Sequence, residues 1–231
     1  MLTRVMWAAV LSGLAAGLLL SALQAWKVLP LIERAETYEV AGGHSHGTAE
    51  TGQEDGDDHD HWSPESASER IMWTAITNLL VGVGFALLLA GVALLSGLPL
   101  TWQNGWAWGL LAFLAFSILP GFGLPPELPG MDAGDLTGRQ AWWMAAAGCA
   151  IAGMVMIAVK PSAPFVVIGL LIIAAPHLIG APPSPLTDRV PPELAAAHVT
   201  ASQSVMAIFW VMLGSLLGWL LNRLPANEEE N

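Results

Sequence analysis

The residues best suited to chemistry lie in one polar stretch, from His44 to His61, which interrupts a sequence that is otherwise largely apolar. Four of the six histidines of the chain fall in it, among acids and glycines and without any Lys or Arg. Imidazole and carboxylate groups bind divalent transition metals, and alternate residues of an extended chain point the same way, so each His-x-His pair can turn two rings toward one ion. The predicted metal ligands of this stretch are His44, His46, Asp57, Asp58, His59, Asp60 and His61.

The same stretch also has a simpler interpretation as a solvated acidic linker. Residues 40–68 combine low hydrophobicity with high charge, a composition that does not support a packed core, so we expect a disordered loop. The two interpretations are compatible, because a disordered loop still captures ions weakly.

The composition of the whole chain indicates a membrane protein. Of its 231 residues, 54% are hydrophobic and 12% are charged, and the mean hydropathy is +0.56. The net charge of -11 is concentrated, because eleven of the nineteen acids lie between Glu33 and Glu69. We expect no nucleic-acid partner, since phosphate neutralisation requires a basic surface. The single cysteine, Cys149, excludes an intrachain disulfide, a CxxC metal site and c-type haem attachment.

Apolar segments of membrane-spanning length recur along the chain. A bilayer core about 30 Å thick requires roughly 20 apolar residues per helix. We therefore predict an all-α fold, a polytopic integral membrane helical bundle of about six transmembrane helices, with five as the alternative count. The chain is treated as a single membrane domain, residues 1–231, and the spans are predicted at about 5–26, 71–95, 106–124, 141–159, 164–180 and 199–221.

Small side chains recur every four residues along the first predicted span, at Ala9, Gly13, Gly17 and Ser21. Such a stripe lets another helix approach closely, although small residues are also common in membrane helices generally. On the second span, Arg70, Thr74, Thr77 and Asn78 share one helical face. These polar groups either line a route into the membrane or hydrogen-bond to a neighbouring helix, and both interpretations stay open.

His177 is the one histidine or charged residue inside a predicted span. It directly follows Pro176, and a proline-broken helix survives in a membrane where it is buried or lines a cavity. His177 is thus either an exchangeable metal ligand or a packed, hydrogen-bonded histidine. Glu127, Asp132 and His198 are candidates to pass an ion to it from the acidic face.

Six spans place the loops after spans one, three and five on one face of the membrane. These loops hold five of the six histidines and sixteen of the nineteen acids. Their five Lys and Arg residues outnumber the three on the other face, which favours a cytoplasmic position for the histidine loop. An importer must collect its ion outside, and on that ground we prefer the external orientation.

Several segments resemble the CbtA family of predicted cobalt transporter subunits, in one order over nearly the whole chain. They are the first span with its His/Asp loop, residues 30–39 (PLIERAETYE), 62–64 (WSP) before Glu69-Arg70, 78–89 (NLLVGVGFALLL), 123–130 (GLPPELPG), 139–143 (RQxWW) and 176–182 (PHLIGAP). The resemblance implies a multi-pass subunit of the bacterial inner membrane. It also implies a small histidine-containing partner subunit of the CbtB type, and cobalt uptake linked to cobalamin synthesis. The chain has no GxxxxGK[ST] motif, so a nucleotide-driven step would belong to another chain.

We therefore predict a non-enzymatic membrane subunit of a divalent transition-metal uptake transporter, with Co²⁺ as the transported ion, Ni²⁺ as the alternative and no permanently bound cofactor. Nitrogen and oxygen ligands bind nickel and copper more tightly than cobalt, so selectivity would come from geometry or supply. Membrane lipid and a further copy of the chain are the other expected partners. The alternatives are a non-transporting metal-binding or accessory subunit and, less favoured because one histidine lies inside a span, a haem-binding membrane protein.

Overall fold

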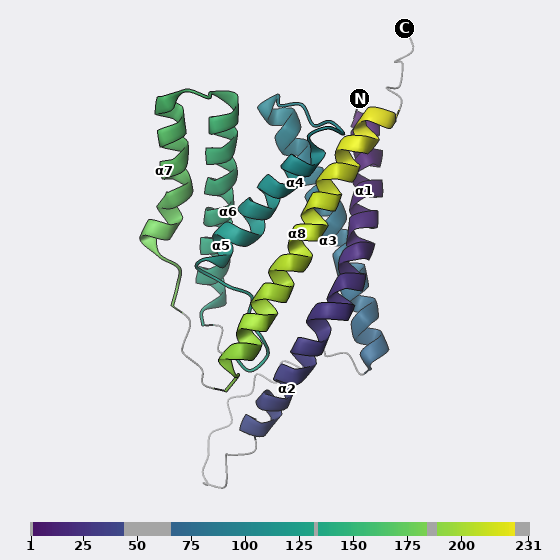
Figure 1. The fold of residues 1–231 in the computed structure, drawn as a ribbon, viewed down its shortest axis with the longest axis vertical. Helices are drawn as coiled ribbons and strands as arrows, with labels where there is room; N and C mark the ends of the chain where they lie inside the picture. The colour runs from purple at the N-terminus through teal and green to yellow at the C-terminus, as the bar shows by residue number, and fades with distance from the viewer. Residues whose placement is uncertain (1, 44–65, 132–133, 184–188, 225–231) are drawn as a thin grey trace.

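The computed structural model describes residues 2–43, 66–131, 134–183 and 189–224, with backbone alone for residues 39–43 and 67. All regular secondary structure in these ranges is helical (Figure 1). The predicted all-α membrane bundle is therefore confirmed. In chain order the elements are α1 (Leu2–Leu23), the π-helical turn η1 (Gln24–Val28), α2 (Leu29–Gly43), α3 (Ala67–Ser96), α4 (Gly105–Phe113), the π-helical turn η2 (Leu114–Ile118), α5 (Leu119–Gly121), α6 (Leu136–Val159), α7 (Ala163–Ile179) and α8 (Pro192–Arg223).

The helix ends follow from local side-chain chemistry. Ser66 caps α3 by accepting from the amide of Glu69, and Asp135 caps α6 by accepting from the amide of Gly138. Gly97 ends α3 with a φ of 70°, a left-handed conformation that glycine adopts without a steric cost. These caps fix the membrane helices in length and leave polar turns between them.

Helices stand at all six predicted span positions, and they fall into two length classes. The long apolar segments are Leu2–Tyr38, Ser68–Ser96, Leu136–Val159 and Pro192–Arg223, each long enough to cross a membrane. The segments Gly105–Gly121 and Ala163–Ile179 are apolar but shorter. The structure thus has four clear candidates for membrane crossing, and crossing by the two short segments stays a prediction.

The helices pack as a bundle with a separate hairpin beside it (Figure 1). Helix α1 packs against α3 and α8, and α8 packs against α4. The core of this bundle includes Phe209, Trp210, Leu213 and Leu217 of α8, whose side chains are fully buried. Helices α6 and α7 pack on each other, and α6 joins the bundle through η2 and α5.

The predicted small-residue stripe of α1 is the surface on which α3 packs. A Cβ at Gly13 would lie 2.5 Å from the Cα of Val83, and a Cβ at Gly17 would lie 2.6 Å from the carbonyl oxygen of Asn78. Only hydrogen atoms fit in these positions, so α1 and α3 are in backbone contact. Close packing, rather than ordinary residue usage alone, explains these glycines.

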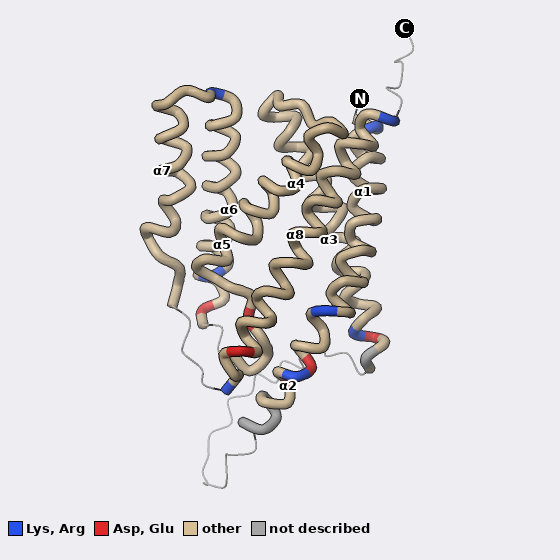
Figure 2. The backbone as a smooth tube through the Cα atoms, in the orientation of Figure 1, with Lys and Arg blue, Asp and Glu red and all other residues tan. Residues whose placement is uncertain are grey.

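The two ends of the bundle differ in charge (Figure 2). At one end of the bundle α2 finishes and α3, α6 and α8 begin. We call this end the loop end. Every Asp and Glu with a described side chain belongs to it, together with Lys27, Arg34, Arg70, Arg139 and Arg189. At the opposite end the described charged residues are Arg4, Lys160 and Arg223. This grouping agrees with the predicted sharing of one face by three loops, while the side of the membrane that the face adopts stays a prediction.

Candidate functional site

A cleft opens between the first helical segment and α3 at the loop end. It has a volume of about 180 Å³ and is lined by Ser21, Gln24, Ala25, Val28, Leu29, Ile32, Arg70, Ile71 and Thr74. The lining contains four polar side chains, two from each wall. We call it the loop-end cleft. Polar groups that line a cavity at membrane depth are the usual mark of a functional site in a membrane protein.

Asn78 lies next to this cleft and hydrogen-bonds two residues of its lining. Its side-chain nitrogen donates to the Oγ of Ser21 at 3.2 Å and to the Oε1 of Gln24 at 2.7 Å. Asn78 is 8% exposed, so both bonds lie inside the protein. The polar face predicted on α3 therefore divides: Arg70 and Thr74 line the cleft, whereas Asn78 links α3 to α1 and η1.

The π-helical turn η1 places Gln24 in the cleft wall. In this turn the amide of Leu29 donates to the carbonyl of Gln24, five residues earlier, instead of four. The wider turn changes which side chains of the continuous helix face α3. Such turns occur frequently at functional sites because they re-aim side chains without breaking the helix.

An ion pair lies at the mouth of the cleft. The Nη1 of Arg70 on α3 donates to the Oε1 of Glu36 on α2, and both side chains are a little over one-third exposed. The carboxylate offsets a guanidinium charge that would otherwise repel a cation entering the cleft. The mouth is thus close to neutral.

The chain connectivity ties the His/Asp stretch to this mouth. Helix α2 ends at Gly43 and α3 begins at Ala67, and residues of both helical segments line the cleft. The stretch rejoins the fold at α3, three residues before Arg70 of the cleft lining, and it leaves at the end of α2, eleven residues after Ile32, the last α2 residue of that lining. His44, His46, Asp57, Asp58, His59, Asp60 and His61 lie outside the described residues, as does Asp132, so their metal-binding role stays a prediction.

A second group of polar contacts surrounds the start of α6. Arg139 donates to both carboxylate oxygens of Glu127, at 2.7 and 2.6 Å, and the two side chains are 13% and 19% exposed. One turn further, the Nε1 of Trp142 donates to the carbonyl of Pro176 at 3.1 Å. Glu127 is therefore held by an arginine near the contact between α6 and α7.

His177 packs against Trp142 in the same region. The two ring centres lie 5.6 Å apart in an edge-to-face arrangement, and the Nε2 of His177 is buried without a hydrogen-bond partner among the described residues. One predicted alternative was a hydrogen-bonded His177, and no described residue supplies that hydrogen bond at Nε2. A buried nitrogen with a free lone pair can accept a proton or a metal ion.

His198 belongs to a different helix pair from His177. It lies on α8 and is 5% exposed, with its Nε2 3.5 Å from the Oγ of Ser202 and its Nδ1 without a described hydrogen-bond partner. Helix α7 packs chiefly on α6, whereas α8 packs chiefly on α4 and α1. Glu127 contacts α6 through Arg139, and His177 contacts α6 through Trp142, so the passing of an ion from Glu127 and His198 to His177 stays a prediction.

No three His, Cys, Asp or Glu side chains among the described residues are close enough to share a metal ion. Residues that the sequence reasoning missed are Ser21, Gln24 and Glu36. The signal for Gln24 was its position one turn after the stripe of small residues that faces α3.

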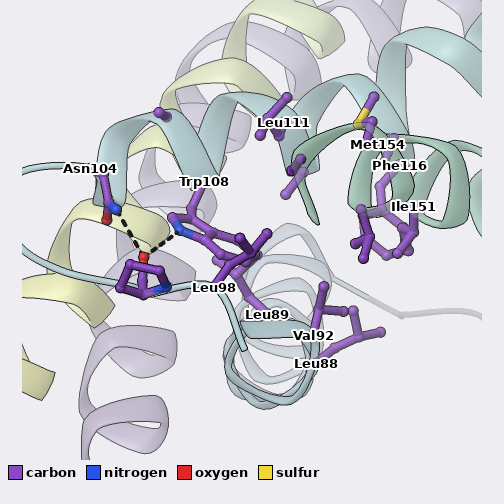
Figure 3. A pocket seen from close by; sticks show the side chains of 16 residues that line it. Leu88, Leu89, Val92, Leu98, Asn104, Trp108, Leu111, Phe116, Ile151 and Met154 are labelled. Atoms are coloured by element: carbon purple, nitrogen blue, oxygen red, sulfur yellow. Dashed lines mark hydrogen bonds between the residues drawn. The ribbon is translucent and has the colours of Figure 1, made fainter. Parts of the chain in front are cut away.

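A larger cavity lies further along α3, toward its C-terminal end, and is almost entirely apolar (Figure 3). It occupies about 260 Å³ between α3, α4, η2 and α6. The two polar side chains in its lining, Asn104 and Trp108, both donate to the carbonyl of Pro99, at 2.8 and 3.2 Å. Both side-chain N–H donors are therefore engaged within the protein.

A comparison with known protein families shows to which family the chain belongs. A family model described as "Probable cobalt transporter subunit (CbtA)" matches residues 2–222. The chain belongs to the CbtA family. Neither curated proteins nor solved structures gave a match. As a CbtA family member with several apolar helices, the protein is a multi-pass membrane subunit of a transporter, so other subunits are implied.

Proposed function

We propose that this CbtA family member is the membrane subunit of an uptake transporter for a divalent transition metal, with Co²⁺ as the cargo, and that the loop-end cleft receives the ion from residues 44–61. The observation that carries the proposal is the connectivity at the cleft. The helical segments on its two walls are the ones that the His/Asp stretch joins. An ion released by the stretch is therefore released at the mouth.

The chemistry of the two parts is complementary. Imidazoles and carboxylates collect the ion from dilute solution, because they bind cobalt better than water does. The hydroxyls of Ser21 and Thr74 and the amide of Gln24 are neutral, weaker ligands. Weak ligands suit a transport route, since the ion must also leave them.

Asn78 hydrogen-bonds Ser21 and Gln24 of the cleft lining, so passage of the ion between α3 and the first helical segment would require a change in these hydrogen bonds. A partner subunit would supply the energy for that change, and we propose a small histidine-containing subunit of the CbtB type. His177 and Glu127, on the α6 side of the molecule, are proposed as later contacts for the ion. The proposed setting is the inner membrane of a bacterium that uses cobalt for cobalamin synthesis.

The test is cobalt accumulation by cells with and without the chain, at scarce and at abundant cobalt. Deletion of residues 44–61 should lower uptake at scarce metal and leave it nearly intact at abundant metal, because the stretch collects ions without lining the route. A matched control replaces the same residues with a Gly/Ser segment of equal length. Uptake that is unchanged at every concentration would remove the stretch from the mechanism.

A second measurement separates this function from that of a non-transporting accessory subunit. Vesicles that contain the chain together with its co-purifying subunits should accumulate cobalt against an external chelator added afterwards. Surface-bound cobalt is stripped by the chelator, whereas cobalt inside the vesicles is retained. Complete loss of cobalt on chelation would favour the accessory alternative.

A further inference from the structure

The end of the bundle opposite the loop end contains a cavity with one charged side chain in its wall. The cavity has a volume of about 300 Å³, and Arg4 of α1 lies in its lining. Most of the remaining wall is apolar and is formed by Val5, Ala90, Ala93, Leu94 and Leu100. A guanidinium group beside an apolar surface is a combination that neither water nor a hydrocarbon chain alone can satisfy.

The position of Arg4 is fixed by α8. Its Nη2 donates to the carbonyl oxygen of Leu221, which also lines the cavity. Carbonyls in the last turn of a helix have no partner within that helix, so this bond satisfies one of them. It holds the arginine at the cavity instead of leaving it free to extend into solvent.

The charge of Arg4 has no counterion in the described protein. The ion pairs between described residues lie at the loop end, where every described acid is also found (Figure 2). The Nε of Arg4 is buried and has no hydrogen-bond partner among the described residues. The other two described cations of this end lie over aromatic rings, Lys160 over Phe165 and Arg223 over Trp219. Among the described cations of this end, Arg4 is the one with a buried nitrogen that lacks a hydrogen-bond partner.

We propose that this cavity binds the phosphate group of an anionic membrane lipid, with the guanidinium of Arg4 on the phosphate and an acyl chain along the apolar wall. A guanidinium group binds phosphate through paired, charge-assisted hydrogen bonds. The site lies where the apolar helices end, at the depth of lipid headgroups. The acidic C-terminal residues Glu228–Glu230 are a competing anion, but their segment lacks the apolar side chains that the wall would require.

The test measures lipid retained by the purified full-length chain, by native mass spectrometry from micelles that contain equal amounts of phosphatidylglycerol and phosphatidylcholine. The wild type should retain phosphatidylglycerol in preference. Arg4→Gln should lower that preference roughly tenfold, since it removes charge-assisted bonds. Arg223→Gln, a charge change at the same end but outside the cavity, should leave the preference unchanged.

Two further variants keep the proposal falsifiable if Arg4→Gln folds poorly. Arg4→Lys preserves the charge and should retain part of the preference, because an ammonium group lacks the paired geometry. Ala93→Leu keeps Arg4 but fills part of the cavity, and it should also lower lipid retention. Equal losses in Arg4→Gln and Arg223→Gln would overturn the proposal, because they would indicate a diffuse charge effect.

Other anions are distinguished in the same experiment. Millimolar inorganic phosphate should not displace the lipid, since it has no acyl chain, and full displacement would reduce the site to a simple anion site and refute the lipid assignment. Deletion of residues 225–231 should leave lipid retention unchanged. Retention that develops only after this deletion would assign the cavity to the C-terminal segment and not to lipid.

Discussion

Replacing Asn78 separates the packing of the cleft from the passage of an ion through it. Asn78→Leu is close in volume and removes two hydrogen bonds, one to Ser21 and one to Gln24. Hydrogen bonds between membrane helices contribute about 0.6 kcal/mol on average and at most about 1.7 kcal/mol each. The expected loss of stability is therefore on the order of 1–2 kcal/mol, which a membrane bundle of this size should tolerate.

Transport should respond much more strongly than stability if the ion passes Asn78. We expect Asn78→Leu to reduce cobalt uptake severely at every cobalt concentration, because an apolar group replaces the polar side chain that hydrogen-bonds Ser21 and Gln24 of the cleft lining. Asn78→Asp should behave differently: the Gln24 amide can turn its nitrogen toward the new carboxylate, so the helices stay linked. The added negative charge should lower the cobalt concentration for half-maximal uptake and slow the maximal rate, since the ion is released less readily.

The assay is uptake of radioactive cobalt into vesicles that contain matched amounts of inserted protein, with thermal unfolding of each variant measured alongside. Thr77→Leu, at the neighbouring, exposed position of α3, is the matched control and should transport normally. Normal uptake by inserted Asn78→Leu protein would refute the reasoning. A decrease in uptake that only follows the amount of inserted protein would likewise assign Asn78 to packing alone.

Three other substitutions test the remaining contacts. Gly13→Val places a side chain where a Cβ would lie 2.5 Å from an α3 backbone atom. The overpacking should cost about 1–3 kcal/mol or more of stability and so lower the unfolding temperature. Gly84→Val, where a Cβ meets no atom within 4 Å, should leave the unfolding temperature unchanged. Glu127→Gln removes the carboxylate that Arg139 contacts, and it should cost about 1–3 kcal/mol of stability, between the values for surface and buried ion pairs. A second change, of Arg139 to Gln, should recover part of this loss in the same melting assay. His177→Ala should abolish cobalt uptake in protein that still inserts, whereas His177→Gln should retain some uptake if a hydrogen bond is all that the position supplies.

The helices could be predicted from the sequence because membrane spans depend on apolar length, a property that is local to each segment. The second span was predicted at 71–95, and α3 extends from Ala67 to Ser96. The third span was predicted at 106–124, and within it the π-helical turn η2 precedes Pro120. A proline indicates that a helix deforms but not which turn becomes π-helical, because that depends on the neighbouring helices.

The continuation of the first helix beyond Trp26 was not predicted. Helix α2 carries charged residues and lacks the composition of a membrane span, so composition alone places the end of the first helix too early. Its inner face is held by tertiary contacts, with Ala35 buried in a small cluster with Leu128 and Val190. These partners lie far away in the sequence, and local pattern cannot reveal them.

The candidate site could be predicted in part. The polar face of α3 follows from helical periodicity, and its neighbour α1 was indicated by the small-residue stripe. Gln24 was missed because the π-helical turn η1 rotates it relative to a regular helix, so spacing alone misplaces its side chain. Glu36 was missed because its partner, Arg70, lies across a long connection in the chain.

Chemical modification of the cleft tests the central claim most directly. Thr74→Cys and Ser68→Cys, each in a Cys149→Ala background, place a thiol in the cleft wall and on the same helix outside it. An impermeant thiol reagent added on the loop side should abolish cobalt uptake through the Thr74→Cys protein and leave uptake through the Ser68→Cys protein intact. Full cobalt uptake after complete modification at residue 74 would contradict the account, because the ion would then bypass the cleft.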